Sequence, residues 1–204
     1  PVSGTTITLT NTSGTVATTT TGTDGKYSFC GLMPGDYTVT ETVPAGWTEV
    51  SKPGPITLVC ASNTTANFVN QELLCINGTK TRSCDNEPVS GTTITLSNTS
   101  GTVATTTTGA DGKYSFCGLM PGDYTVTETV PAGWTEVSKP GLITLVCASN
   151  TTADFVNQEL LCINGTKTRS CDNEPVSGTT ITLSNSSGTV ATTTTGADGK
   201  YSFC

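Results

Sequence analysis

The sequence predicts an all-β fold, built as a tandem array of Ig-like β-sandwich domains with about seven short strands each. No stretch places apolar residues at the i, i+3, i+4, i+7 spacing of an amphipathic helix. Instead, short runs of alternating apolar and polar residues are separated by turns rich in Gly, Pro and Asn. The whole pattern also repeats with a period of 87 residues, which is long enough for one small domain per repeat.

The repeats are almost identical. Residues 1–87 return as residues 88–174 with four substitutions, and residues 175–204 repeat residues 88–117 with one. Such faithful copying favours an extended structural protein, in which each copy adds length. An enzyme gains little from duplicating one site. The substitutions are Thr10/Ser97, Thr23/Ala110, Pro55/Leu142 and Asn67/Asp154 between the first two copies, and Thr99/Ser186 in the third.

The strands of one repeat follow from alternation and from turn residues. Residues 5–10 alternate, with Ile7 and Leu9 on one face, and residues 11–14 (Asn-Thr-Ser-Gly) form a turn. Residues 15–21 then form a threonine-rich strand, because threonine is a good strand former. The remaining strands are expected at residues 26–30, 37–43, 56–60 and 65–70, with turns at residues 22–25, 33–36 and 44–47.

These elements divide the chain into sandwiches and connectors. A connector is interpreted either as a loop with a local disulfide or as a segment that packs on, or adds a strand to, the adjacent domain. Because residue 204 falls inside an expected strand, we expect the sequence to be a window cut from a longer polymer. The expected boundaries are a first sandwich at residues 1–74, a connector at 75–87, a second sandwich at 88–161, a connector at 162–174, and the first part of a third sandwich at 175–204.

Composition excludes several classes of function. The net charge is −7 and there is no basic run, so nothing is available to neutralise nucleic-acid phosphates. No apolar stretch is long enough to span a bilayer. The absence of histidine excludes Ser-His and Cys-His nucleophiles, and we expect no enzyme and no cofactor other than covalent glycans.

Cysteine usage indicates an oxidising, extracellular compartment. Each full repeat has four cysteines and none is in a C-x-x-C pair, which favours disulfides over zinc. Four cysteines allow three connectivities. Cys75 and Cys84 flank a loop centred on Asn77-Gly78, a hairpin signal, so we expect a small ring there, with Cys30 bonded to Cys60. The expected pairs are Cys30–Cys60, Cys75–Cys84, Cys117–Cys147 and Cys162–Cys171, with the partner of Cys204 outside the segment.

One observation opposes the expected Cys30–Cys60 pair. Cys30 is out of phase with the inward residues Tyr27 and Phe29 of its strand, whereas Cys60 is in phase with Ile56. A β-bulge at the strand end could absorb the difference.

Each full repeat also carries three Asn-x-Ser/Thr sequons in expected turns or the connector, which suits surface glycosylation. The threonine runs are candidates for O-linked sugars, although threonine also simply favours strands. The N-glycosylation candidates are Asn11, Asn63, Asn77, Asn98, Asn150, Asn164 and Asn185, and the O-glycosylation candidates are Thr18, Thr19, Thr20, Thr21, Thr105, Thr106, Thr107 and Thr108.

Residues 24–47, which read DGKYSFCGLMPGDYTVTETVPAGW, resemble the SdrD B-like and Cna-B-like repeats of bacterial surface adhesins and pili. The resemblance implies a prealbumin-like, carboxypeptidase-regulatory-like sandwich and a spacer role. Many Cna-B-like domains carry an isopeptide bond between a lysine of the first strand and an asparagine of the last. Here residues 5–10 contain no lysine, Asn67 becomes Asp154, and the remaining candidate Asn70 lacks a partner.

We therefore expect disulfides in place of the isopeptide bond. In the family a buried acid assists that bond, so Glu41 is interpreted as a hydrogen-bonded remnant. Asp24 and Asp36 each stand alone in a turn, which favours a structural role over calcium binding.

The leading hypothesis is a structural protein, a segment of an extracellular, disulfide-stabilised and glycosylated fibre. Its expected partners are neighbouring repeats of the same chain and identical chains in a fibre. The alternative is a passive stalk of a cell-surface adhesin whose binding head lies outside the segment. Ice binding by threonine rows such as Thr38, Thr40 and Thr42 is a third interpretation.

Overall fold

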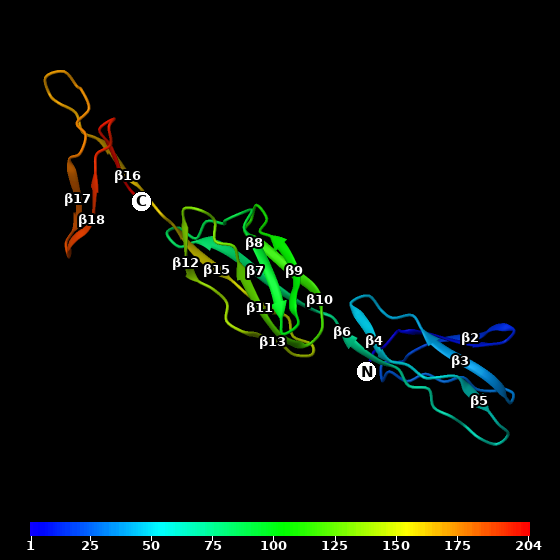
Figure 1. Cartoon of the computed structure of the whole chain (residues 1–204). Coiled ribbons are helices and arrows are strands. Elements are labelled where there is room, and N and C mark those ends of the chain that lie inside the picture. Colours follow the sequence, from blue (N-terminus) through cyan, green and yellow to red (C-terminus); the bar gives the residue numbers. More distant parts are fainter.

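The computed structural model describes all 204 residues and contains only strands, turns and loops. Three bodies follow one another in a row from the N-terminal end to the C-terminal end (Figure 1). No helix is present that could cross a membrane. The first body contains β1 (Thr6–Asn11), β2 (Gly14–Thr20), β3 (Gly35–Glu41), β4 (Trp47–Ser51), β5 (Ile56–Leu58) and β6 (Val69–Glu72).

The second body is a complete two-sheet sandwich, called sandwich 2 below. One sheet has the order β13-β11-β8-β9 and the other the order β10-β7-β15-β12, with the short strand β14 also paired to β7. Its elements are β7 (Leu74–Arg82), β8 (Thr93–Asn98), β9 (Gly101–Thr107), β10 (Lys113–Leu119), β11 (Gly122–Glu128), β12 (Trp134–Ser138), β13 (Ile143–Leu145), β14 (Thr151–Thr152) and β15 (Phe155–Glu159).

Strand β7 corrects the expected domain boundary. It begins directly after the first body and pairs antiparallel with β10 and parallel with β15, so the segment 75–87 starts with an inner strand of the next sandwich. Of the two interpretations of the connector, the one in which it adds a strand to the adjacent domain is confirmed.

Asn77-Gly78 is consequently not a hairpin turn, as the sequence had suggested. A Cβ at Gly78 would lie 2.5 Å from the Tyr114 ring and 2.0 Å from the Ala153 carbonyl oxygen. Glycine is needed there for close packing across β7, not for a turn.

The core of sandwich 2 depends on β7. Leu74 and Ile76, at 2% and 0% exposure, belong to a cluster of thirteen buried residues from both sheets. The first body, called sandwich 1 below, contains no such strand, and its buried apolar residues are only Ile7, Leu9, Tyr37 and Val39. The same sequence therefore forms a closed core only where a strand from the end of the preceding repeat is inserted.

Identical residues adopt different structures in the two sandwiches. Residues 113–119 form β10 against β7, whereas the identical residues 26–32 form no strand. The backbone groups of a strand need a partner, and in sandwich 1 the edge that β7 would occupy is open.

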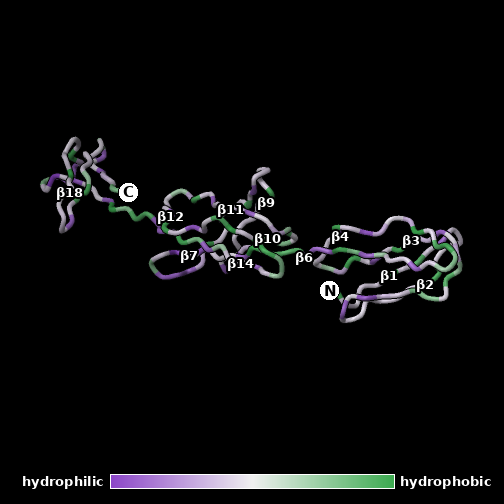
Figure 2. Tube along the Cα trace, turned by 90° about the horizontal axis from the view of Figure 1, so that it is seen from below, coloured by the Kyte–Doolittle hydropathy of each residue, from purple (hydrophilic) through white to green (hydrophobic).

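The third body, formed by residues 162–204, repeats the beginning of a sandwich. Strand β16 (Ile163–Thr166) pairs with β19 (Lys200–Phe203), as β7 pairs with β10, and β17 (Thr180–Asn185) pairs with β18 (Gly188–Thr194). Figure 2 shows a hydrophobic stretch in the segment that joins the second and third bodies. Leu161, which lies between β15 and β16, is 77% exposed, whereas its counterpart Leu74 is buried.

Candidate functional site

A lysine, a glutamate and an asparagine meet inside sandwich 2. Lys80 comes from β7, Glu128 from the end of β11 in the opposite sheet, and Asn157 from β15. The side chains of Lys80 and Glu128 are completely buried, as is Asn157. The ammonium group of Lys80 donates a hydrogen bond to Oε2 of Glu128 and lies 5.9 Å from the centre of the Phe155 ring.

The strand geometry explains why these side chains face inward. Along β7, residues Leu74, Ile76, Gly78 and Lys80 alternate into the core. Strand β15 runs parallel to β7 with Lys80 opposite Phe155. Asn157, two residues further on, therefore points to the same face as Phe155.

The polar groups at this site are incompletely satisfied. Both amide atoms of Asn157, and Oε1 of Glu128, are buried without a hydrogen-bond partner. Buried polar groups normally have partners, so this carboxamide beside a buried amine and a carboxylate needs an explanation. A lysine amine, a carboxamide and a proton-transferring acid are together able to form an amide cross-link between two strands.

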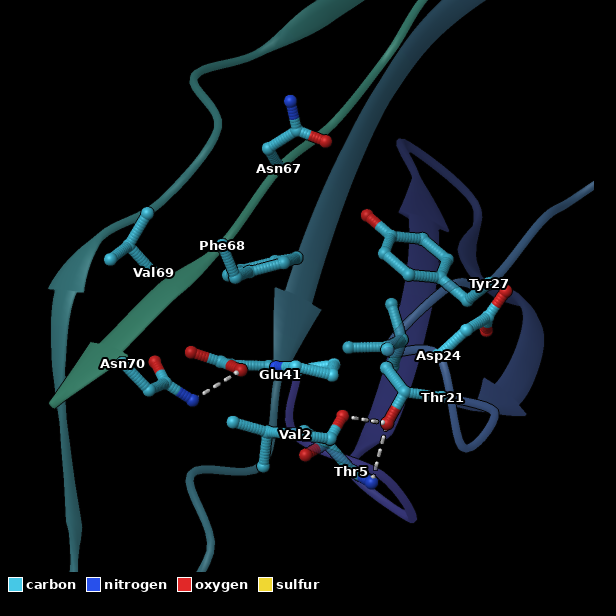
Figure 3. Close-up of a pocket in the computed structure, with 13 residues that line it drawn as sticks. Val2, Thr5, Thr21, Asp24, Tyr27, Glu41, Asn67, Phe68, Val69 and Asn70 are labelled. Carbon is cyan, nitrogen blue, oxygen red and sulfur yellow. Dashed lines mark hydrogen bonds between the residues drawn. The ribbon is translucent and has the colours of Figure 1, made fainter. Parts of the chain in front are cut away.

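Sandwich 1 contains the acid and the asparagine without the lysine. Nδ2 of Asn70 donates to Oε2 of Glu41 at 3.0 Å, beside a cavity of about 310 Å³. Figure 3 shows this cavity between β6 and the segment that carries Tyr27. The third body contains only the lysine of this set. It is Lys167, which follows β16 and is exposed.

The sequence-based argument against an isopeptide bond was wrong in its premise. The first strand of the sandwich is β7 rather than residues 5–10, so the lysine comes from the end of the preceding repeat. The Asn67/Asp154 substitution lies outside the site, since Asp154 instead accepts hydrogen bonds from the amide and hydroxyl of Thr79, both at 2.8 Å.

The disulfides also differ from the expected pairs. Cys75 is bonded to Cys117, and Cys162 to Cys204, each across 42 residues. Cys75 and Cys117 lie on the neighbouring strands β7 and β10, on the face away from the core, while Cys162 and Cys204 lie directly before β16 and directly after β19. Their phase explains why Cys30 was out of step with Tyr27 and Phe29. The predictions Cys30–Cys60, Cys75–Cys84, Cys117–Cys147 and Cys162–Cys171 are therefore wrong, as is a partner for Cys204 outside the segment; Cys30, Cys60, Cys84, Cys147 and Cys171 are exposed thiols.

All seven sequon asparagines are exposed, but they do not share one environment. Asn11 lies at a hairpin turn, where its Oδ1 accepts a hydrogen bond from the amide of Ser13 at 2.8 Å. Asn98 and Asn185 make the equivalent contact. Asn77 lies within β7 and accepts from Ser115, and Asn150 accepts from the amide of Cys75.

The threonine runs lie on and just after β2 and β9, which are edge strands. Thr18, Thr20, Thr105 and Thr107 are exposed. Thr108 is 4% exposed and its hydroxyl donates to the Val89 carbonyl oxygen at 2.7 Å. Thr21 makes the equivalent bond, so these two hydroxyls hold the start of the repeat and are poorly placed for sugars.

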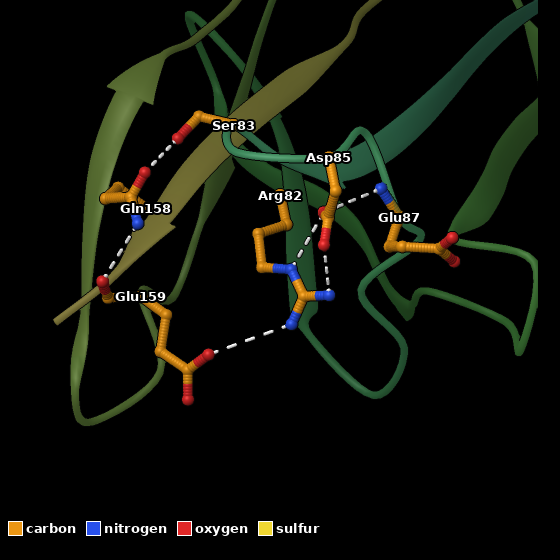
Figure 4. A network of polar contacts seen from close by, with 6 residues as sticks. All are labelled: Arg82, Ser83, Asp85, Glu87, Gln158 and Glu159. Carbon is orange, nitrogen blue, oxygen red and sulfur yellow. Dashed lines mark hydrogen bonds and ion pairs between the residues drawn. The ribbon is translucent and has the colours of Figure 1, made fainter. Parts of the chain in front are cut away.

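A polar network closes the C-terminal end of sandwich 2 (Figure 4). The Arg82 guanidinium donates to Asp85 at 2.9 Å and lies 3.8 Å from Glu159. Hydrogen bonding from Arg82 lowers the pKa of the Asp85 carboxyl to about 2. Ser83 donates its amide to the Asn157 carbonyl oxygen at 2.9 Å and its hydroxyl to the Gln158 side chain.

Tyr114 completes the wall beside the buried site. Its hydroxyl donates to the Ala153 carbonyl oxygen. Burial, followed by the negative charges of Asp154 and Glu128, raises the pKa of this phenol well above its usual range, so the donor stays protonated.

Comparison with known proteins identifies the domain type. The model of the SdrD B-like domain matches residues 1–55 and 66–141. The chain is 31% identical over 250 residues to serine-aspartate repeat-containing protein F of Staphylococcus epidermidis, which covers 99% of this chain. It is 30% identical over 252 residues to serine-aspartate repeat-containing protein D of Staphylococcus aureus strain Newman, again covering 99% of this chain.

The chain spans 14% and 19% of the lengths of these two relatives. Among solved structures, it is similar to the Bacillus anthracis TIE protein, with 18% identity, a TM-score of 0.43, and coverage of 99% of this chain and 40% of the other. It is also similar to a streptococcal ancillary pilin, with 17% identity, a TM-score of 0.44, and coverage of 84% and 63%.

Proposed function

We propose that this chain, which belongs to the family of SdrD B-like domains, is a tension-bearing segment of an extracellular stalk or fibre. The observation that carries the proposal is that Lys80 of the first strand, β7, and Asn157 of the last core strand, β15, are both buried on the face where Glu128 of β11 pairs with Lys80. A covalent bond between these two strands would carry the tension applied to the ends of the domain.

The path of force through sandwich 2 follows from its topology. The chain enters through β7 and leaves through β15, and these two strands are adjacent and parallel. Tension on the two ends therefore shears the β7–β15 ladder along its length. A bond from Lys80 to Asn157 would carry force directly from the entering to the leaving strand, so that the residues between them are not extended.

The bond formation is a transamidation that needs no external reagent. Glu128 first accepts one proton from the Lys80 ammonium, and the resulting neutral amine attacks Cγ of Asn157. A C–N bond forms and the original C–NH₂ bond breaks. The leaving nitrogen takes up the proton held by Glu128 and the one released by the lysine nitrogen, and departs as ammonium, which restores the carboxylate. The hydrogen bond between Glu128 and Lys80 places the carboxylate for this transfer, and burial holds the groups together without competing water.

Disulfides reinforce the same strand. The Cys75–Cys117 bond joins β7 to β10, and closing a loop of this size stabilises a folded domain by about 4 kcal/mol. Both cross-links therefore secure the strand that comes from the preceding repeat, which supports a disulfide-stabilised fibre in an oxidising compartment.

Glycosylation belongs to the proposal as a surface coat. The exposed hairpin sites Asn11, Asn98 and Asn185 recur once per repeat beside the edge strands β2, β9 and β18. Sugars there would cover edges that are otherwise templates for aggregation. The partners are the neighbouring sandwiches of the same chain, and the location is the cell surface or its exterior.

A stalk that carries a separate binding head is the second candidate. It is favoured by the share of the relatives' length that the chain spans, 14% and 19%, which leaves room for other domains. The two candidates differ only in what is attached to the repeats, and a non-repeated head in the full-length protein would select the stalk.

The cross-link is tested by intact mass under denaturing, reducing conditions. We expect the chain to be lighter than its sequence by one ammonia, and the variant Lys80→Met to have the full mass. Lys167→Met is the matched control, because this exposed lysine has no acid or asparagine beside it, and it should still lose one ammonia.

The mechanical role is tested by pulling single molecules from both ends. Sandwich 2 should resist extension in the wild-type chain, whereas in Lys80→Met it should extend, except for the residues that the Cys75–Cys117 disulfide closes. A wild-type chain in which sandwich 2 unravels as easily as in that variant would contradict the tension-bearing role.

A further inference from the structure

Two cysteines per repeat have no role in the closed sandwich. In sandwich 2 these are Cys84 and Cys147, both exposed thiols. They lie at opposite ends of the domain, because Cys84 follows the end of β7 while Cys147 lies in the loop whose Asn150 contacts Cys75 at its beginning. At about 3.3 Å per residue, β7 separates the two ends by about 30 Å.

Cys147 faces the preceding sandwich. Its Sγ lies 3.7 Å from both Nε2 and Oε1 of Gln71, which is in β6 of sandwich 1. This side-chain contact crosses the junction between the first two bodies.

Cys84 lies beside the counterpart of that same glutamine. One period after Gln71 is Gln158, whose side chain accepts a hydrogen bond from Ser83. The parallel register of β7 and β15 places Arg82 opposite Asn157, and Cys84 lies in the turn that follows, directly after Ser83. The glutamine at this position of the repeat therefore lies close to both cysteines. As Gln71 it contacts Cys147 across the junction, and as Gln158 it contacts Ser83, the neighbour of Cys84, within one sandwich.

We propose that Cys84 forms a disulfide with the counterpart of Cys147 in the sandwich that follows, wherever two complete sandwiches are consecutive. In this chain each junction contains one member of the pair. The first junction has Cys147, while the counterpart of Cys84 would come one period earlier, before Pro1. The second junction has Cys84, while the counterpart of Cys147 would come one period later, after Cys204.

The bond forms by thiol–disulfide exchange. One thiolate attacks a low-molecular-weight disulfide and releases one thiol, and the second protein thiolate then displaces the other half from the mixed disulfide. One S–S bond forms in the protein and one breaks in the oxidant, which accepts the two electrons. Both protein thiols are exposed, so the oxidant can reach them.

The bond makes the array covalently continuous in a way that is independent of the lysine cross-link. A bond at the junction connects sandwich to sandwich, whereas Cys75–Cys117 and the lysine site act within one sandwich. It also restricts the angle between neighbours, because the junction otherwise consists of a short segment and a few polar contacts.

The test adds residues 74–87 as a second copy in front of Pro1. This addition supplies sandwich 1 with its missing strand and places a counterpart of Cys84 beside Cys147. After equilibration in oxidised and reduced glutathione, the folded monomer is alkylated, digested and mapped. We expect the added strand to be linked to Cys30 through its first cysteine and to Cys147 through its second.

Matched variants isolate the junction. Cys147→Ser should abolish the second linkage and leave one additional alkylatable thiol. Cys60→Ser, at the equivalent position of sandwich 1, should leave the linkage intact, because it faces no preceding sandwich in this chain. A linkage of the added cysteine to Cys60, or a free Cys147 while the strand is bonded to Cys30, overturns the proposal.

A second chain covers the case in which the added strand does not insert. The sequence of residues 118–204 is appended after Cys204, which completes the third sandwich and places both cysteines at the second junction. Cys84 must then be linked to the appended counterpart of Cys147. If Cys84 remains alkylatable in that folded monomer, the proposal is wrong.

Discussion

Gly78 in β7 lies directly against the ring of Tyr114 in β10, so closely that a Cβ at position 78 would be 2.5 Å from the ring atoms. The hydroxyl of the same tyrosine donates to the Ala153 carbonyl oxygen, and that oxygen also lies 2.0 Å from the Cβ position. This hydrogen bond joins both neighbours of the Cβ position to each other, so the backbone of β7 has no room for a side chain here.

The variant Gly78→Ala should therefore destabilise sandwich 2 by about 3 kcal/mol, the upper part of the range for overpacked cores. Urea unfolding followed by the fluorescence of Trp134, in a Trp47→Phe background, measures the change. Gly141→Ala is the control, because a Cβ there meets nothing within 4 Å. Equal stability of the two variants would show that β7 is not packed as described.

Loss of the Cys75–Cys117 disulfide should weaken the same sandwich. Cys75→Ser removes a bond that closes 42 residues, and we expect a loss of about 4 kcal/mol. The same fluorescence measurement applies, with Cys84→Ser as a matched change on an exposed thiol. A similar effect of both variants would argue against the assigned pairing.

The acid of the buried site has a separable role. In Glu128→Gln the side chain keeps its shape but can no longer accept the lysine proton, so ammonia loss should slow by at least 100-fold. Intact mass followed over time after refolding gives the rate. Glu136→Gln is the control, because its carboxylate pairs with Lys139 away from the site; unaltered kinetics in Glu128→Gln would exclude the proton transfer.

Much of the fold was predictable from local pattern. The alternation around Ile7 and Leu9, and around Tyr37 and Val39, gives the four buried residues of the sandwich 1 core, since strand periodicity is a local property. The repeat period of 87 residues correctly predicted that the chain contains two full units and part of a third. These features need no knowledge of which strands are neighbours.

Pairing between distant segments was not predictable in the same way. Asn77-Gly78 has the composition of a hairpin turn, and only the presence of Tyr114 reveals the glycine as a packing residue. Lys80 is in phase with Leu74 and Ile76, which was the one signal available for the site. A lysine in an inward position is rarely buried, however, and local pattern alone could not supply Glu128 and Asn157.

The charge pair at the end of sandwich 2 should persist to low pH. Because the folded-state pKa of Asp85 is lowered to about 2 from an ordinary value near 4, its contribution is present above pH 4 and is lost as the pH falls through 2. Carboxyl NMR titration measures this pKa, and Arg82→Gln should return it toward the ordinary value. A normal pKa in the wild-type chain would contradict the Arg82–Asp85 contact.

Hydrogen exchange should distinguish two identical segments of the chain. Residues 113–119 form β10, and the identical residues 26–32 have no partner strand. We expect slow amide exchange in the first and fast exchange in the second, because only hydrogen-bonded strand amides in a closed core are protected. Adding residues 74–87 before Pro1 should slow exchange in residues 26–32 alone. Equal protection of both segments in the unmodified chain would mean that sandwich 1 closes without a strand from the preceding repeat, and the domain boundary at β7 would then be wrong.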